Sequence, residues 1–150
     1  MHRSLVKALV VASLVWPLLI VGAAWPDEHG QLPAWSAVVY VAGSRICHQR
    51  PERSFQTAGV QWPVCGRCSG LYLSAPFGAI VASVALRRRR TVPKSAVIGL
   101  AIASLPTAVT LGLEFVLAVP VGNLTRFLAA LPLGAAVAFV VVATAGGSTR

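Results

Sequence analysis

Charged residues are scarce in this chain. Only 11% of its 150 residues are charged, and Asp and Glu together number four. A soluble domain carries about twice that charged fraction, so an ordinary water-soluble globular fold is excluded. Hydrophobic residues make up 56% of the chain instead, and its mean hydropathy is +0.74. This balance indicates an integral membrane protein.

The shortage of acidic residues leaves a net charge of +9. The run Arg87–Arg90 resembles a nucleic-acid-binding patch when it is read in isolation. It lies between two hydrophobic segments, however, where basic residues commonly mark the cytoplasmic side of a membrane protein. We therefore expect membrane lipids, and no nucleic acid, as partners.

Four segments are long and apolar enough to cross a bilayer, which takes roughly 20 residues in a helix. We expect spans at about residues 5–24, 69–86, 95–119 and 124–145. The sequence thus predicts an all-α membrane protein with four transmembrane helices in a single domain, residues 1–150. A cleaved signal peptide is the alternative for the first segment, because residues 21–24 resemble a small-residue cleavage site.

Residues 25–68 join the first two predicted spans as an external loop. Within this loop, Leu32–Ser44 is uncharged but too short to cross the bilayer. Trp35 and Tyr40 are residue types typical of the boundary between membrane and water. We therefore expect a short interfacial helix in this part of the loop.

The distribution of basic residues predicts the orientation. Four spans place both termini on one side, together with Arg3, Lys7, Lys94, Arg150 and the run Arg87–Arg90. The loop side is also basic, but its acidic residues reduce the excess. Cytoplasmic segments carry the larger share of Lys and Arg, so we expect a multi-pass protein of the cell membrane with both termini in the cytoplasm.

All three cysteines lie between residues 47 and 68, inside the external loop. Cys65 and Cys68 have the Cys-x-x-Cys spacing of a zinc knuckle, and Cys47 or His48, or both, would complete four ligands. The sequence therefore predicts a metal site of Cys47, His48, Cys65 and Cys68. Zinc and copper(I) are the ions that best match such soft ligands.

The same thiols allow two other interpretations. A Cys-x-x-Cys pair at the start of a helix is typical of reactive thiols, so a membrane thiol-disulfide oxidoreductase using Cys65, Cys68 and Cys47 is the first alternative. A disulfide from Cys47 to either of the others, which would tie the loop to the second span, is a purely structural alternative. The pattern does not separate an enzyme from a binding protein.

Three arginines of the loop support a further alternative. Arg50, Arg53 and Arg67 lie at the predicted membrane surface, where guanidinium groups bind phosphates and anionic head groups through paired hydrogen bonds. The chain would then be an anion- or lipid-binding, transporter-like protein. Four short helices form a small bundle, so a transport pathway would require a homo-oligomer.

Glu114 is the only acidic residue inside a predicted span. An ionisable residue within a membrane is a functional candidate by default. Glu114 is near the end of the third span, where it could reach Arg126 at the start of the fourth span or the cysteine loop. A purely structural pair between Glu114 and Arg126 is the alternative.

The strings Cys47–Phe55 and Pro63–Tyr72 resemble a motif of an uncharacterised family of small bacterial and archaeal membrane proteins. The family motif is Cys-His-Gln-x-Pro-x-Arg-Ser-Phe, followed by Pro-Val-Cys-x-Arg-Cys-x-Gly-x-Tyr. Asn123 and Arg126 resemble a later Asn-x-x-Arg feature of this family, and Glu114 resembles an acid that its members tend to carry in the third span. The family is described as a domain of unknown function, so the resemblance supports the membrane fold and implies no activity.

Overall fold

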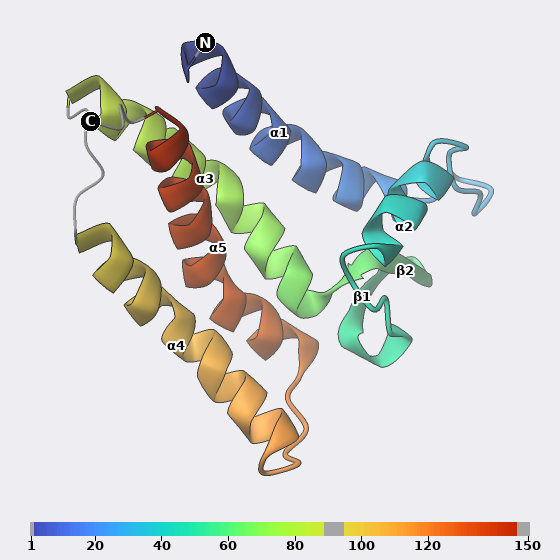
Figure 1. The fold of residues 1–150 in the computed structure, drawn as a ribbon. Helices are drawn as coiled ribbons and strands as arrows, with labels where there is room; N and C mark the ends of the chain where they lie inside the picture. Colours follow the sequence, from blue (N-terminus) through green and yellow to red (C-terminus); the bar gives the residue numbers. More distant parts are fainter. Residues whose placement is uncertain (1, 89–94, 147–150) are drawn as a thin grey trace.

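The computed structural model describes residues 2–88 and 95–146 (Figure 1). Four helices in this part of the chain are long and apolar enough to cross a membrane. They are α1 (His2–Ala23), α3 (Gly66–Arg88), α4 (Ser95–Phe115) and α5 (Asn123–Gly146). The short helix α2 (Ser36–Ser44) lies where the sequence predicts an interfacial helix. The predicted all-α fold with four candidate spans is confirmed.

The helices begin and end at slightly different residues than the hydropathy predicts. Helix α3 begins at Gly66, ahead of the predicted start at residue 69, so Cys68 belongs to its first turn. Helix α4 ends at Phe115 rather than at residue 119, and Ala118 in the following connection has a φ of 51°. The residues Arg89, Arg90, Lys94 and Arg150, which entered the predicted orientation, lie outside the described residues.

Helices α3 and α5 pack together most extensively. Glycines sit where their backbones meet: a Cβ on Gly78 would lie 1.9 Å from the carbonyl oxygen of Ala135, and one on Gly134 would lie 2.2 Å from that of Leu71. Small residues permit such an approach in lipid, where dispersion contacts drive helix packing. Helix α1 packs on α3, and α4 packs on α5 (Figure 1).

The outer faces of the bundle are apolar. Large exposed hydrophobic side chains occur on every long helix, for example Leu18, Phe77, Ile102 and Leu128. A contiguous surface of this kind would associate in water, whereas in a bilayer it faces acyl chains. The exposed side chains therefore agree with a membrane location.

The external loop contains a β-hairpin, which the sequence did not predict. After α2 come a single 3-10 turn, η1 (Pro51–Arg53), and an antiparallel hairpin of β1 (Ser54–Thr57) and β2 (Val60–Cys65). Its two-residue turn has φ values of 49° at Ala58 and 81° at Gly59, as a type I′ turn requires. The turn lacks the Asn-Gly or Asp-Gly pair that signals such a hairpin, which is why the hairpin was missed.

The hairpin and α2 lie at one end of the bundle, where α1 and α4 end and α3 and α5 begin (Figure 1). Strand β2 continues directly into α3 without a connecting loop. The last residue of the strand and the first turn of the helix therefore share one rigid junction. Both residues of the Cys-x-x-Cys pair belong to this junction.

Candidate metal centre

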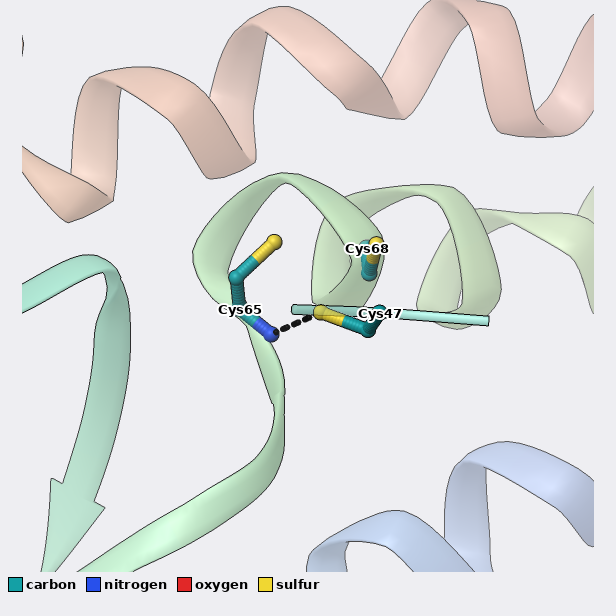
Figure 2. Close-up of side chains that lie close together, drawn as sticks. All are labelled: Cys47, Cys65 and Cys68. Carbon is teal, nitrogen blue, oxygen red and sulfur yellow. Dashed lines mark hydrogen bonds between the residues drawn. The ribbon is translucent and has the colours of Figure 1, made fainter. Parts of the chain in front are cut away.

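Three cysteines from two separate segments meet where β2 passes into α3 (Figure 2). Cys47 follows α2, Cys65 is the last residue of β2, and Cys68 lies in the first turn of α3. Their sulfur atoms all lie within 4.8 Å of one another. All three are free thiols, so neither disulfide of the structural alternative is formed.

Two backbone hydrogen bonds set the position of Cys47. Its own N–H donates to the carbonyl oxygen of Gly43 at 2.9 Å, which attaches it to the end of α2. The N–H of Cys65 donates to the Cys47 sulfur at 3.1 Å, the dashed line in Figure 2. Cys47 is only 7% exposed and packs with Ile20 of α1 and Val64 of β2. Its sulfur is therefore shielded from water and directed at the other two.

Hydrogen bonding favours the thiolate form of Cys47. The thiols of Cys65 and Cys68 lower the pKa of Cys47 most, and backbone N–H groups of Gln49 and Cys65 lower it further, against the opposing effect of burial. The start of α3 adds the positive end of a helix dipole beside the cluster. Thiolates are the form in which cysteine binds metal ions, so the surroundings of Cys47 suit a metal ligand.

Gln49 holds the segment after Cys47 against α2 and β2. Its Nε2 donates to the carbonyl oxygens of Tyr40 at 2.8 Å and Pro63 at 2.7 Å. The Nε2 of Gln61 in turn donates to the Gln49 carbonyl oxygen at 2.6 Å. Sequence reasoning did not assign Gln49 a role; its place two residues after Cys47 in the motif was the available signal.

Gly43 is a second residue that the sequence analysis missed. A Cβ at this position would lie 2.5 Å from the carbonyl oxygen of Pro63 and 2.9 Å from Nε2 of Gln49. Any side chain here would push α2 away from β2. Cys47 is hydrogen-bonded to the end of α2, and Cys65 is the last residue of β2. The close packing of α2 on β2 at Gly43 therefore brings the two thiols together.

The structure does not bring His48 to the sulfur atoms. Its side chain is exposed, and among the described residues the group with converging ligand atoms consists of Cys47, Cys65 and Cys68. Cys47 is buried against α1 and β2, whereas the next side chain along the chain faces outward. Three of the four predicted ligands, all of them thiols, therefore converge, and His48 does not.

The spacing of the three thiols fits a soft metal ion. Two sulfur ligands on a tetrahedral zinc ion, at about 2.3 Å each, lie about 3.8 Å apart. The sulfur atoms here lie within 4.8 Å of one another, so small side-chain rotations would bring all three within bonding distance of one metal ion. The three cysteines could therefore hold a metal ion, with one coordination position left for another ligand.

An ion-pair network adjoins the cysteine segment. Glu114, near the end of α4, accepts a hydrogen bond from Arg67 at 3.2 Å through Oε2 and one from Nε of Arg126 through Oε1. The side chains of Glu114, Arg67 and Arg126 are 4%, 16% and 10% exposed. Both contacts expected from the sequence are present, because Glu114 pairs with Arg126 and also reaches Arg67, one of the two residues between Cys65 and Cys68.

Further polar contacts extend this network to four elements. Arg126 donates to Oδ1 of Asn123 at 2.7 Å, and Nδ2 of Asn123 donates to the carbonyl oxygen of Ser54 in β1 at 3.0 Å. Arg67 also donates to the hydroxyl of Thr110 at 3.2 Å. The starts of α3 and α5, the last turns of α4 and the hairpin are thereby joined. Thr110 carried no sequence signal, whereas Ser54 belongs to the motif Cys47–Phe55.

The three arginines predicted to bind an anion have different surroundings. Arg50 is exposed and lies 4.0 Å from Glu52. The guanidinium carbon of Arg53 lies 5.8 Å from the ring centre of Phe115. Arg67 is part of the buried ion-pair network. Anion or lipid binding by these side chains stays a prediction.

Comparisons with known proteins agree with a membrane protein. The family described as Predicted membrane protein (DUF2085) matches residues 47–140. An uncharacterized protein of Methanothermobacter thermautotrophicus is 57% identical over 30 residues, which cover 20% of this chain and 27% of that protein. An uncharacterized protein of Methanocaldococcus jannaschii is 44% identical over 46 residues, which cover 31% of this chain and 30% of that protein. The chain thus spans less than a third of the length of these relatives, and no solved structure matches it.

Proposed function

This chain belongs to the predicted membrane protein family DUF2085, and we propose that it binds a soft metal ion through Cys47, Cys65 and Cys68. The observation that carries the proposal is the convergence of their three sulfur atoms within 4.8 Å of one another. Thiolate ligands select zinc and copper(I) over magnesium and calcium, which prefer oxygen. The family description names no activity, so the proposal depends on the site itself.

In this proposal the fourth coordination position is available to a water molecule, to a substrate or to His48. Structural zinc sites are closed by four protein ligands, whereas zinc sites that act on a substrate keep one position open. His48 directly follows Cys47 but is exposed, so it would have to move to bind the ion. The three-thiol arrangement therefore supports a site with room for an exchangeable ligand.

We further propose that the metal centre faces the outside of the cell membrane and that both termini are cytoplasmic. Arg3 and Lys7 are exposed at the start of α1, at the end of the bundle opposite the cysteines (Figure 1). The positive-inside preference puts such residues in the cytoplasm. The run Arg87–Arg90 at the end of α3 in the sequence supports the same orientation.

A thiol-disulfide oxidoreductase is the second candidate, because all three thiols are free and close to one another. Oxidation of the Cys65 and Cys68 thiols to a disulfide would release two protons and two electrons. A disulfide of a partner protein would accept these two electrons and two protons and become a dithiol. Cys65, which is only half-buried, would attack the partner's disulfide and release one partner thiol, and Cys68 would then attack the Cys65 sulfur of this mixed disulfide and release the second.

Elemental analysis and thiol titration of the purified, detergent-solubilised protein test the proposal. We expect close to one zinc or copper ion per chain and thiols that react only after a chelator is added. Cys68→Ser should abolish the bound metal, while Ser83→Ala, an exposed hydroxyl on the same helix, should leave it unchanged. Metal-free protein with three reactive thiols would support the oxidoreductase, and one reactive thiol would indicate a disulfide.

A further inference from the structure

The ion-pair network beside the cysteines is unbalanced in charge. Arg67 and Arg126 contribute two positive charges and Glu114 contributes one negative charge, which leaves one positive charge in excess. Among the described residues, the buried Nε of Arg67 has no hydrogen-bond partner. A net charge shielded from water is costly unless an opposite charge lies close to it. The network therefore calls for a neighbouring negative charge.

Carboxylates do not supply that charge. The remaining acidic residues, Asp27, Glu28 and Glu52, are all exposed, so water screens them from the network. Glu114 is the only buried acid and already pairs with both arginines. The thiolates of the cysteine cluster, two of which flank Arg67 in the chain, are the remaining groups that can carry negative charge.

The network and the cysteines occupy one packed junction. Arg67 lies between two of the three cysteines in the first turn of α3. The adjacent Gly66 packs so closely on the start of α5 that a Cβ there would lie 2.9 Å from the carbonyl oxygen of Asn123. Asn123 in turn accepts a hydrogen bond from Arg126. Both arginines therefore lie at the same end of the bundle as the thiols.

We infer that the Arg67–Glu114–Arg126 network is the counter-charge of the metal centre and that its net charge sets the preference between Zn²⁺ and Cu⁺. This inference rests on the proposed metal binding. Three thiolates around Zn²⁺ carry one negative charge, which the excess positive charge of the network cancels. Around Cu⁺ the same thiolates carry two negative charges, and one of them is left unbalanced at a poorly hydrated site.

The size of the effect follows from Coulomb's law. A unit charge at about 10 Å changes the binding of a second unit charge roughly ten-fold when the effective dielectric constant is about 20. Loss of the negative charge of Glu114 should weaken the binding of both ions. The loss in binding free energy should be twice as large for Zn²⁺ as for Cu⁺, because Zn²⁺ carries twice the charge. The ratio of the two affinities should therefore fall about ten-fold in Glu114→Gln.

Competition of the purified protein with chelators for Zn²⁺ and for Cu⁺, in separate titrations at one pH, measures this ratio. Glu114→Gln should lower the preference for Zn²⁺ about ten-fold. Glu52→Gln is the matched control, since it removes the same charge from an exposed position in the external loop. Its ratio should stay at the wild-type value.

A second variant separates charge from structure. Glu114→Gln combined with Arg126→Gln restores the single excess positive charge, so the affinity ratio should return to the wild-type value. Arg126→Gln alone removes the excess and should raise the preference for Zn²⁺ about ten-fold. If Glu114→Gln does not fold, the double variant and Arg126→Gln still differ by one charge and carry the comparison.

The outcomes separate the two proposals. Equal affinity ratios in the wild type, Arg126→Gln and the double variant would overturn the inference while leaving metal binding intact. A wild-type protein that binds neither ion would overturn the proposed function itself. A uniform loss of affinity for both ions, without a change of ratio, would show that the network has only a structural role.

Discussion

The backbone N–H of Cys65 donates to the sulfur of Cys47, 18 residues earlier in the chain, at 3.1 Å. This bond joins the end of the hairpin to the segment that follows α2. It places a donor on the sulfur that hydrogen bonding already favours as a thiolate. The candidate metal centre therefore depends on the folded external loop.

Substitution of His48 by alanine tests the number of protein ligands. Because the side chain is exposed and outside the sulfur cluster, we expect His48→Ala to change the metal affinity less than about three-fold, whereas loss of a ligand would cost far more. Chelator competition measures the affinity. His29→Ala, another exposed histidine of the external loop, is the control. A loss of ten-fold or more specific to His48→Ala would restore the four-ligand site.

Gly43→Ala should loosen the metal centre without touching a ligand. The new Cβ would meet the carbonyl oxygen of Pro63 at 2.5 Å, and backbone shifts of this kind cost about 1–3 kcal/mol. We expect a lower unfolding temperature of the detergent-solubilised protein and weaker metal binding. Ser44→Ala, at the exposed end of the same helix, should alter neither. An unchanged metal affinity in Gly43→Ala would contradict the link between α2 packing and the site.

Gly78→Ala should destabilise the central helix pair. Its Cβ would lie 1.9 Å from the carbonyl oxygen of Ala135, and the clash cannot be relieved by a side-chain rotation because the contacted atoms of Ala135 all belong to the backbone. We expect a loss of roughly 3 kcal/mol, measured as thermal or denaturant unfolding in detergent. Gly99→Ala in α4 is the matched control, since nothing lies within 4 Å of that position. Equal stability of the two variants would contradict this close approach of α3 to α5.

Metal binding should release protons, and Cys47 limits their number. Each thiol that is protonated in the free protein must lose its proton to bind the ion, so affinity falls as the pH falls. Hydrogen bonds from Cys65 and Cys68 lower the pKa of Cys47, so this group is already a thiolate near neutral pH. We expect about two protons released per Zn²⁺ rather than three at pH 7, from calorimetry in buffers of different ionisation enthalpy. Release of three would contradict a preformed Cys47 thiolate.

The proposed orientation can be measured on intact cells. Glu28→Cys places a thiol on the exposed loop, and Ser4→Cys places one at the opposite end of the bundle. An impermeant maleimide should label Glu28→Cys from outside and Ser4→Cys only after the membrane is opened. The reverse pattern would place the metal centre in the cytoplasm and contradict the positive-inside argument.

The sequence by itself determined the membrane character and the main elements. Hydropathy is a local property, so runs of apolar residues identified the four long helices, and the uncharged, aromatic Leu32–Ser44 segment identified α2. The Cys-x-x-Cys spacing is also local. It keeps Cys65 and Cys68 close to each other whatever fold the rest of the chain adopts.

Only the tertiary structure decided which distant residues meet. Cys47 reaches the pair because the hairpin reverses the chain and Gly43 lets α2 approach β2, while His48, one residue later, faces outward. Arg67 and Glu114 are 47 positions apart and meet because α3 and α4 both pack beside α5. Such contacts depend on turn geometry and helix packing. Turn geometry and helix packing arise from interactions between separate segments, so no single stretch of sequence contains the information that sets them.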